Sequence, residues 1–209
     1  MTDQHVAQAE PERDSELFID FANTLELSDG EPDDHVPDAG ALRAWLVQRE
    51  LVRGHPAPSM VNRQIPAFRE LRTLVREVVA RLASDRAPTG KQVRSLNRVL
   101  RDGLHYHELR PALDGARFTV GQVGDELDQA RAAIAGSLAH YLAEHPVDRL
   151  RVCADDGCRW LFVDRSPAGR RRWCDMRTCG NRAKVARHRA RARAGAGRRP
   201  RSRWGATPS

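Results

Sequence analysis

The 209-residue chain lacks the features that would place it in several common classes of protein. No apolar run approaches the roughly 20 residues that a membrane-spanning helix needs, so we expect no contact with a membrane. The polar and acidic residues 1–13 lack the apolar segment of a secretory signal, so we expect a cytoplasmic protein. A Gly-rich phosphate loop, a nucleophile elbow and an H-E-x-x-H motif are also absent, so we expect that the chain is not an enzyme.

Lysine is almost absent, since Lys91 and Lys184 are the only two, and a GC-rich genome alone can produce such a bias toward arginine. The charge is unevenly distributed. Residues 147–209 hold 18 Lys and Arg against 5 Asp and Glu, a net charge of +13, whereas residues 1–146 hold 17 against 23, a net charge of −6. This asymmetry indicates a nucleic-acid partner, and a basic tail that only solubilises the protein is the alternative.

Cysteine is absent outside one segment, where Cys153, Cys158, Cys174 and Cys179 form two C-x4-C pairs separated by 15 residues. Two close thiolate pairs are what one tetrahedral zinc ion needs. Two disulfides are the first alternative, but disulfides are rare in the cytosol. An iron–sulfur cluster is the second, but the cysteine spacing fits the tight bacterial ferredoxin pattern poorly. A redox-switched zinc site is a third alternative. Because four cysteines leave no open position for water, we predict one structural Zn²⁺.

Apolar residues at helical spacing predict a mainly helical N-terminal region with a hairpin, an α+β fold. Asp38 and Thr89 are predicted helix caps, and Pro66 is expected in a first turn. A Pro/Gly/Asp-rich loop is predicted at 27–37. Helices are expected at about residues 17–25, 38–46, 66–84, 89–100 and 125–145, and strands at 104–109 and 116–120 around a turn at 113–116.

Three polar residues, Asp20, Asn23 and Thr24, lie on the apolar first predicted helix. Side chains of these types often form hydrogen bonds with nearby backbone, which would cap or position the helix. The alternative is that they form the polar lining of a pocket for a small-molecule effector.

The cysteine-rich segment predicts a small treble-clef-like zinc module. Gly157 would let the backbone turn so that amides point at the sulfurs. Residues 159–164 and 170–174 are predicted to form a hairpin around a turn at 166–169, followed by an Ala/Arg-rich helix from Asn181. Trp160, Phe162 and Trp173 would cover the metal as a small core.

The basic residues of this module are candidate nucleic-acid contacts. Most would bind phosphates, and Asn181, Arg182 or Arg187 could read base edges. For Asn181, helix capping or a hydrogen bond near the thiolates is the alternative. The predicted contacts are Arg170, Arg171, Arg172, Arg182, Lys184, Arg187, Arg189 and Arg191.

The segment from Cys153 to Arg191 resembles the bacterial CGNR zinc-finger family. The resemblance rests on C-G-N-R at residues 179–182, on F-V-D at 162–164, on R-R-R-W-C at 170–174 and on Lys184. The region upstream, with residues 18–25, Trp45-Leu46 and the apolar spacing of residues 71–82, is similar to the ABATE domain that commonly precedes this finger. The resemblance implies a stress-related transcription regulator with a zinc-dependent DNA-binding module.

These observations divide the chain into four parts and lead to one function hypothesis. We predict a disordered N-terminus (1–14), an ABATE-like helical domain (15–146), a zinc finger with a basic helix (147–194) and a disordered basic tail (195–209). The hypothesis is a DNA-binding transcription regulator whose N-terminal domain senses a ligand or forms a homodimer. An RNA-binding protein and an adaptor that meets an acidic protein partner are the alternatives.

Overall fold

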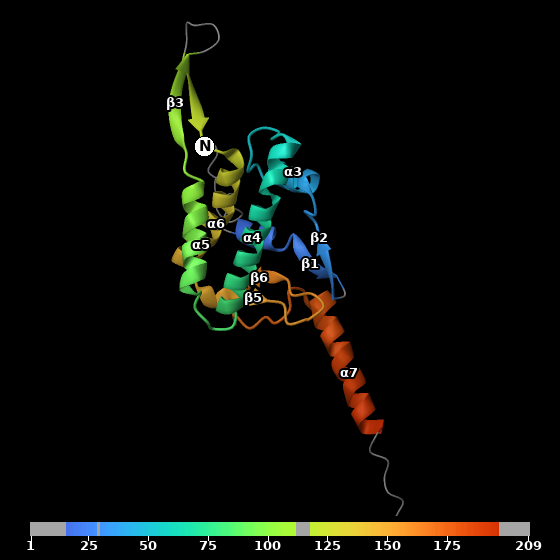
Figure 1. Ribbon diagram of the computed structural model, residues 1–209. Coiled ribbons are helices and arrows are strands. Elements are labelled where there is room, and N and C mark those ends of the chain that lie inside the picture. The colour runs from blue at the N-terminus through green and yellow to red at the C-terminus, as the bar shows by residue number, and fades with distance from the viewer. Residues whose placement is uncertain (1–15, 29, 112–117, 197–209) are drawn as a thin grey trace, which may run out of the picture.

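The computed structural model describes residues 16–28, 30–111 and 118–196 and shows a helical body with three small hairpins (Figure 1). The body consists of α2 (Leu17–Ala22), α3 (Ala39–Gln48), α4 (Pro58–Leu82), α5 (Gly90–Asp102) and α6 (Glu126–Glu144). The hairpins are antiparallel and pair β1 (Leu25–Ser28) with β2 (Glu31–Asp34), β3 (Tyr106–Pro111) with β4 (Phe118–Val123), and β5 (Leu150–Val152) with β6 (Leu161–Val163). The chain continues through the short helices η1 (Val147–Arg149) and η2 (Met176–Gly180) into α7 (Asn181–Ala196).

The core lies where α2 meets the long helices α4 and α6. Phe18 and Phe21 of α2 are fully buried there, and α4 and α6 contribute apolar residues at spacings of three and four. Burying each such side chain stabilises the fold by roughly 1.5–3 kcal/mol. The prediction of a mainly helical chain with small hairpins is confirmed. Among the described residues, no helix combines the length and apolar character needed to cross a membrane.

The predicted helix caps are confirmed in detail. The Asp38 side chain accepts a hydrogen bond from the backbone N–H of Ala41 at 2.9 Å and starts α3. Thr89 and Gln92 exchange hydrogen bonds in a capping box that starts α5. Asp125 caps α6, which ends at Glu144, just before Pro146. These helix boundaries follow from local sequence because a cap bonds within its own first turn.

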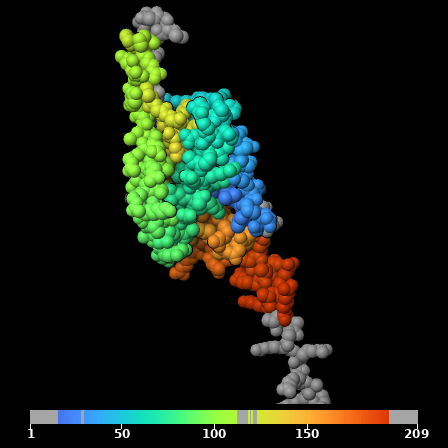
Figure 2. Space-filling view, in the orientation of Figure 1, coloured from blue at the N-terminus to red at the C-terminus, as the bar shows by residue number. Residues whose placement is uncertain are grey.

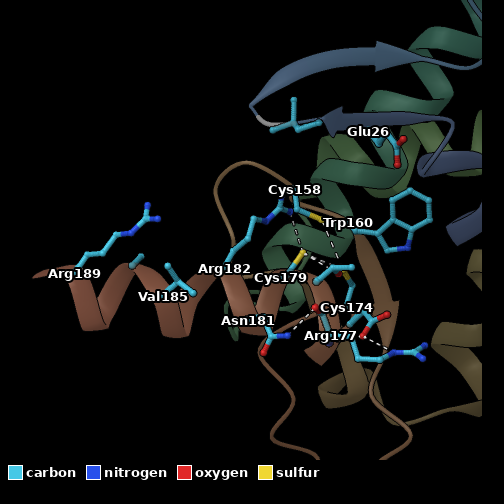
Figure 3. Close-up of a pocket in the computed structure, with 14 residues that line it drawn as sticks. Glu26, Cys158, Trp160, Cys174, Arg177, Cys179, Asn181, Arg182, Val185 and Arg189 are labelled. Carbon is cyan, nitrogen blue, oxygen red and sulfur yellow. Dashed lines mark hydrogen bonds and ion pairs between the residues drawn. The ribbon is translucent and has the colours of Figure 1, made fainter.

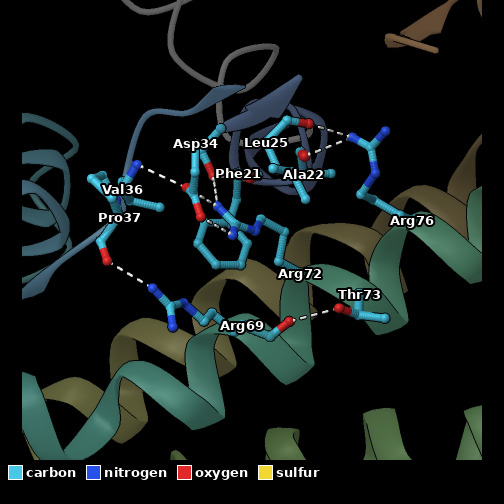
Figure 4. A network of polar contacts seen from close by, with 11 residues as sticks. Phe21, Ala22, Leu25, Asp34, Val36, Pro37, Arg69, Arg72, Thr73 and Arg76 are labelled. Carbon is cyan, nitrogen blue, oxygen red and sulfur yellow. Dashed lines mark hydrogen bonds and ion pairs between the residues drawn. The ribbon is translucent and has the colours of Figure 1, made fainter. Parts of the chain in front are cut away.

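The prediction for residues 17–37 is wrong in two respects. The first helix ends at Ala22 rather than near Leu25, and the β1–β2 hairpin occupies residues 25–34, where the end of that helix and most of the loop were expected. Arginines of α4 hold this hairpin in place (Figure 4). Arg72, which is 4% exposed, donates to both carboxylate oxygens of Asp34 at 2.7 Å, and Arg76 donates to the carbonyls of Ala22 and Leu25 at 2.9 Å.

Two further boundaries differ from the prediction. Helix α4 begins at Pro58, so Pro66 lies inside the helix rather than in its first turn. Proline cannot donate to the carbonyl four residues earlier, but Pro66 is exposed and water can satisfy that carbonyl. The prediction of a return strand at 170–174 is wrong as well. The partner of β6 is the strand at residues 150–152, which precedes the first cysteine.

The β5–β6 hairpin joins the zinc-binding segment to the helical body. Leu150 and Leu161 are buried in the same core as Phe18. Asn23, at the end of α2, donates to the carbonyl of Leu161 at 2.9 Å and accepts from its N–H at 3.0 Å. The Gly30 N–H also donates to the Gly157 carbonyl at 3.3 Å, which links the first hairpin to the cysteine segment. The two regions therefore share one core.

The predicted β3–β4 hairpin is confirmed with somewhat shifted ends, and its turn at 113–116 lies outside the described residues. The hairpin projects from the end of the body opposite α7 (Figure 1). Helix α7 continues to Ala196, so the predicted tail at 195–209 begins too early by two residues. The rest of that tail, from residue 197, and the predicted disordered segment 1–14 lie outside the described residues.

Candidate zinc centre and basic helix

The four cysteines converge on one point at the base of α7. Their sulfur atoms all lie within 4.8 Å of one another, with Cys158 and Cys179 at 3.6 and 3.7 Å from Cys174. A tetrahedral ion with Zn–S bonds of about 2.3 Å has an S–S edge of about 3.8 Å. Both the spacing and the all-thiol donor set therefore fit zinc, and the four cysteines form a closed site for one structural zinc ion.

The metal-free thiols do not ionise equally. Burial raises the pKa of Cys158 to about 11 and also raises the pKa of Cys174, which the neighbouring thiols raise further. Burial opposes ionisation of Cys179, but the Arg182 guanidinium donates to its sulfur at 3.3 Å and lowers its pKa. Zinc must therefore displace protons from Cys158 and Cys174, whereas Arg182 stabilises the Cys179 thiolate.

Asp155 organises the turn that carries Cys158. Its carbonyl accepts from the Cys158 N–H at 2.9 Å, and its carboxylate accepts from the Gly157 N–H at 3.1 Å and from Arg182 Nε at 2.9 Å. The expectation that Gly157 provides the special backbone conformation is wrong, because Arg159 is the residue with a left-handed φ of 54°. This turn lets the Trp160 N–H bond to the Cys158 sulfur, which favours the thiolate.

The predicted aromatic cover over the metal site is confirmed. Phe162 is buried among the cysteines, and the half-buried Trp160 and Trp173 pack against the same cluster. Gly180 is required by this packing, because a Cβ there would lie 2.8 Å from Trp173 Cδ1 and 3.0 Å from the end of Met176. The glycine of the C-G-N-R sequence thus lets the chain pass close to the aromatic cover.

Helix α7 leaves the zinc centre and projects away from the body (Figures 1 and 2). Every side chain from residue 184 to residue 193 is exposed, and α7 contains no acidic residue. Like charges repel along such a helix, so the zinc-anchored start at η2 is its main support. The arrangement presents a dense positive charge clear of the body.

The predicted nucleic-acid contacts are all exposed, but they do not all have the same surroundings. Five of them line one hollow between the 166–173 segment and the start of α7. Arg182 faces the other side of the helix, where it bonds to Asp155 and the Cys179 sulfur. Asn181 donates to the Arg177 carbonyl at 2.9 Å. The five residues in the hollow are Arg170, Arg171, Arg172, Lys184 and Arg187.

The three polar residues predicted on the first helix, Asp20, Asn23 and Thr24, all bond to protein partners. Asp20 pairs with Arg49, and Asn23 holds the backbone of Leu161. The buried Thr24 hydroxyl donates to the Phe21 carbonyl at 2.8 Å and accepts from Arg72 at 3.0 Å. These contacts favour the positioning role over the lining of an effector pocket, which stays a prediction.

A larger hollow, of about 1050 Å³, lies between the β1–β2 hairpin and α7 (Figure 3). Cys158, Cys174 and Cys179 line its floor, Glu26 lies on the hairpin side, and Arg189 lies on the helix side. Sequence analysis missed this hollow because it did not predict the hairpin. Glu26 and Leu27, which line the hollow on the hairpin side, carry no signal of it in the sequence.

Comparisons with protein families match both parts of the chain. Residues 15–145 match the ABATE family, described as "Putative stress-induced transcription regulator", and residues 149–192 match the CGNR zinc finger. The ABATE match alone spans more than half of the chain. No match was found among curated proteins. The resemblance seen in the sequence is thereby confirmed.

Proposed function

The chain belongs to the ABATE family and carries a CGNR zinc finger at residues 149–192, and from this premise we propose that it is a zinc-dependent DNA-binding regulator of transcription. It would act in the cytoplasm and in a stress response. The observation that carries the proposal is helix α7, which is free of acidic residues, exposed from residue 184 to residue 193, and anchored beside the zinc site. Charge of this density attracts the phosphate backbone regardless of base sequence.

The position of the tryptophans favours DNA over RNA as the partner. Single-stranded RNA is commonly bound by exposed aromatic side chains that stack on bases. Trp160 and Trp173 are half-buried in the cover of the metal site. The proposal includes no catalytic step, since a zinc ion with four protein ligands has no open position for a substrate. Ligand sensing or dimerisation by residues 15–146 remains a prediction.

Binding of zinc-loaded protein to a mixed-sequence duplex, followed by fluorescence anisotropy across a salt series, tests the proposal. We expect a Kd in the micromolar range or tighter at low salt and a steep loss of affinity as salt rises. Chelation of zinc should abolish most binding, because α7 then loses its anchor. Absence of binding at low salt, with zinc content verified, would remove DNA as the partner and favour RNA or an acidic protein.

A further inference from the structure

The two sides of α7 differ in their electrostatic surroundings. On one side, Arg182 and Arg189 border the larger hollow together with Glu26 and Asp175. On the other side, Lys184 and Arg187 border a hollow of about 390 Å³ whose lining contains no acidic residue. An anion that approaches the first side meets carboxylates, whereas on the second side it meets only cations and apolar or small side chains.

Within the smaller hollow, four of the five cations keep N–H groups available to a ligand, although Arg187 Nε donates to the Ala183 carbonyl at 3.4 Å. Arg171 is committed elsewhere, because its guanidinium donates to the carbonyls of Trp173 and Cys174 and lies 5.1 Å from the Phe162 ring. In the described part of the chain, none of the other four cations pairs with a carboxylate. We call them the basic groove: Arg170, Arg172, Lys184 and Arg187.

The segment that carries two of these arginines is held in a fixed conformation. Asp164, 1% exposed, accepts from the N–H and hydroxyl of Ser166 and from the N–H of Arg171, at 2.6–3.0 Å. Arg149 donates to the Ser166 carbonyl at 2.8 Å, and Arg151 donates to the Gly169 carbonyl at 2.9 Å. A rigid loop loses little conformational freedom when it binds a ligand.

The floor of the basic groove orients one of its arginines. The Arg172 guanidinium lies 4.5 Å from the centre of the Trp173 ring, a cation–π contact that restricts its movement. Gly180 lines the same floor, where a side chain would collide with Trp173. The hollow has the volume of about thirteen water molecules, at about 30 Å³ each, which is ample for a hydrated phosphate group.

We propose that the basic groove is the phosphate-binding subsite of this protein. A nucleic-acid backbone would pass between the 166–173 segment and α7, and the Arg182–Arg189 side of the helix would face away from it. This inference rests on the proposed function and adds the orientation of α7 on its ligand. Arg182 is assigned a positioning role, since it ties the helix to Asp155 and to the Cys179 sulfur.

The test compares two variants of the full-length, zinc-loaded chain that carry the same charge change on the same helix. The groove variant is Lys184→Gln with Arg187→Gln, and the control is Arg189→Gln with Arg193→Gln, two positions that share the opposite side by helical spacing. Binding to a mixed 20-base-pair duplex and to a fluorescent inorganic polyphosphate is measured across a salt series. Zinc content and circular dichroism verify that both variants fold.

We expect the groove variant to lose about tenfold or more in duplex affinity at moderate salt, with its log–log salt slope shallower by about 1.8. The control should lose far less. Arg170→Gln with Arg172→Gln should reproduce the loss from the other wall of the groove. Equal losses in the groove variant and the control would overturn the groove while leaving DNA binding in place.

The polyphosphate separates failure of the groove from failure of the proposed function. Groove-dependent binding of polyphosphate without binding of the duplex would retain the phosphate subsite and reject DNA as the ligand. If the wild-type chain bound neither probe, both proposals would be overturned.

Discussion

Arg72 shows how one side chain can determine the local fold. It is buried on α4, and its two bonds to Asp34 fasten β2 to the body. A buried guanidinium needs such a partner, because removing one member of a buried pair leaves a charge without compensation. The pair therefore explains why an acidic segment with a proline adopts a strand.

Asp34→Asn should destabilise the protein in a pH-dependent manner. The Arg72 hydrogen bond lowers the pKa of Asp34 below its ordinary value of 3.8, although burial opposes the shift. A lowered pKa contributes stability that is present above the unfolded pKa and is lost as the pH falls through the folded one. We expect a cost of about 2 kcal/mol at pH 7 that shrinks below about pH 4, measured by urea unfolding.

Asp33→Asn serves as the control, because Asp33 is its exposed neighbour on the same strand. It should change stability by less than about 0.5 kcal/mol at either pH. A cost for Asp34→Asn that is the same at pH 7 and pH 3 would contradict the ionic role of the pair.

At the scale of elements, predictions that depend on local sequence are confirmed, whereas those that depend on contacts with distant residues are wrong. The boundaries of α3, α5 and α6 could be predicted because apolar spacing and caps are encoded within one segment. The β1–β2 hairpin could not, since Glu31, Pro32 and Asp33 are poor strand formers and the contacts that hold them come from α4. The alternation of residue types likewise predicted the strand that contains Leu161, but not the strand that pairs with it.

The candidate site shows the same division. All four zinc ligands could be predicted from spacing alone, because the chain offers no other thiols. The sequence could not predict which basic residues bond within the protein and which are left to contact a ligand. This distinction depends on Asp155, which reaches Arg182 across 27 positions, and on carbonyl groups that Arg171 reaches only in the folded loop.

Cys174→Ser should release zinc and loosen η2 and α7 while sparing the β5–β6 hairpin. The hairpin should persist because Leu150 and Leu161 lie in the core of the body rather than in the metal cover. Hydrogen–deuterium exchange with mass spectrometry measures this, with zinc quantified in parallel. Retention of one zinc per chain with an unchanged exchange pattern would contradict the assignment of all four cysteines as zinc ligands. Loss of protection throughout residues 150–163 would contradict the shared core.

At the scale of the whole molecule, positive charge is concentrated at one end. The described part of the body holds acidic and basic residues in nearly equal numbers, whereas the basic helix α7 projects at the end away from the β3–β4 hairpin (Figure 2). A polyanion can therefore reach α7 without passing along the body.

Residues 147–209 produced alone should bind zinc less tightly than the full chain. Without the body, Leu150 and Leu161 lose the apolar surface that buries them, at roughly 1.5–3 kcal/mol for each side chain. Since zinc binding and folding of the finger are coupled, affinity should fall by at least about tenfold. Competition with a chromophoric chelator measures the difference. Equal affinities of the two proteins would show that the finger folds independently.

The two hydrogen bonds between Asn23 and Leu161 have a consequence for protein engineering. A zinc finger whose core is formed by its own residues can be moved from one protein to another. This finger instead packs part of its core against α2 and α4. A graft of the cysteine segment onto another scaffold would transfer the metal ligands without the surface that aims α7. Chimeras that exchange the finger should therefore exchange α2 and α4 with it.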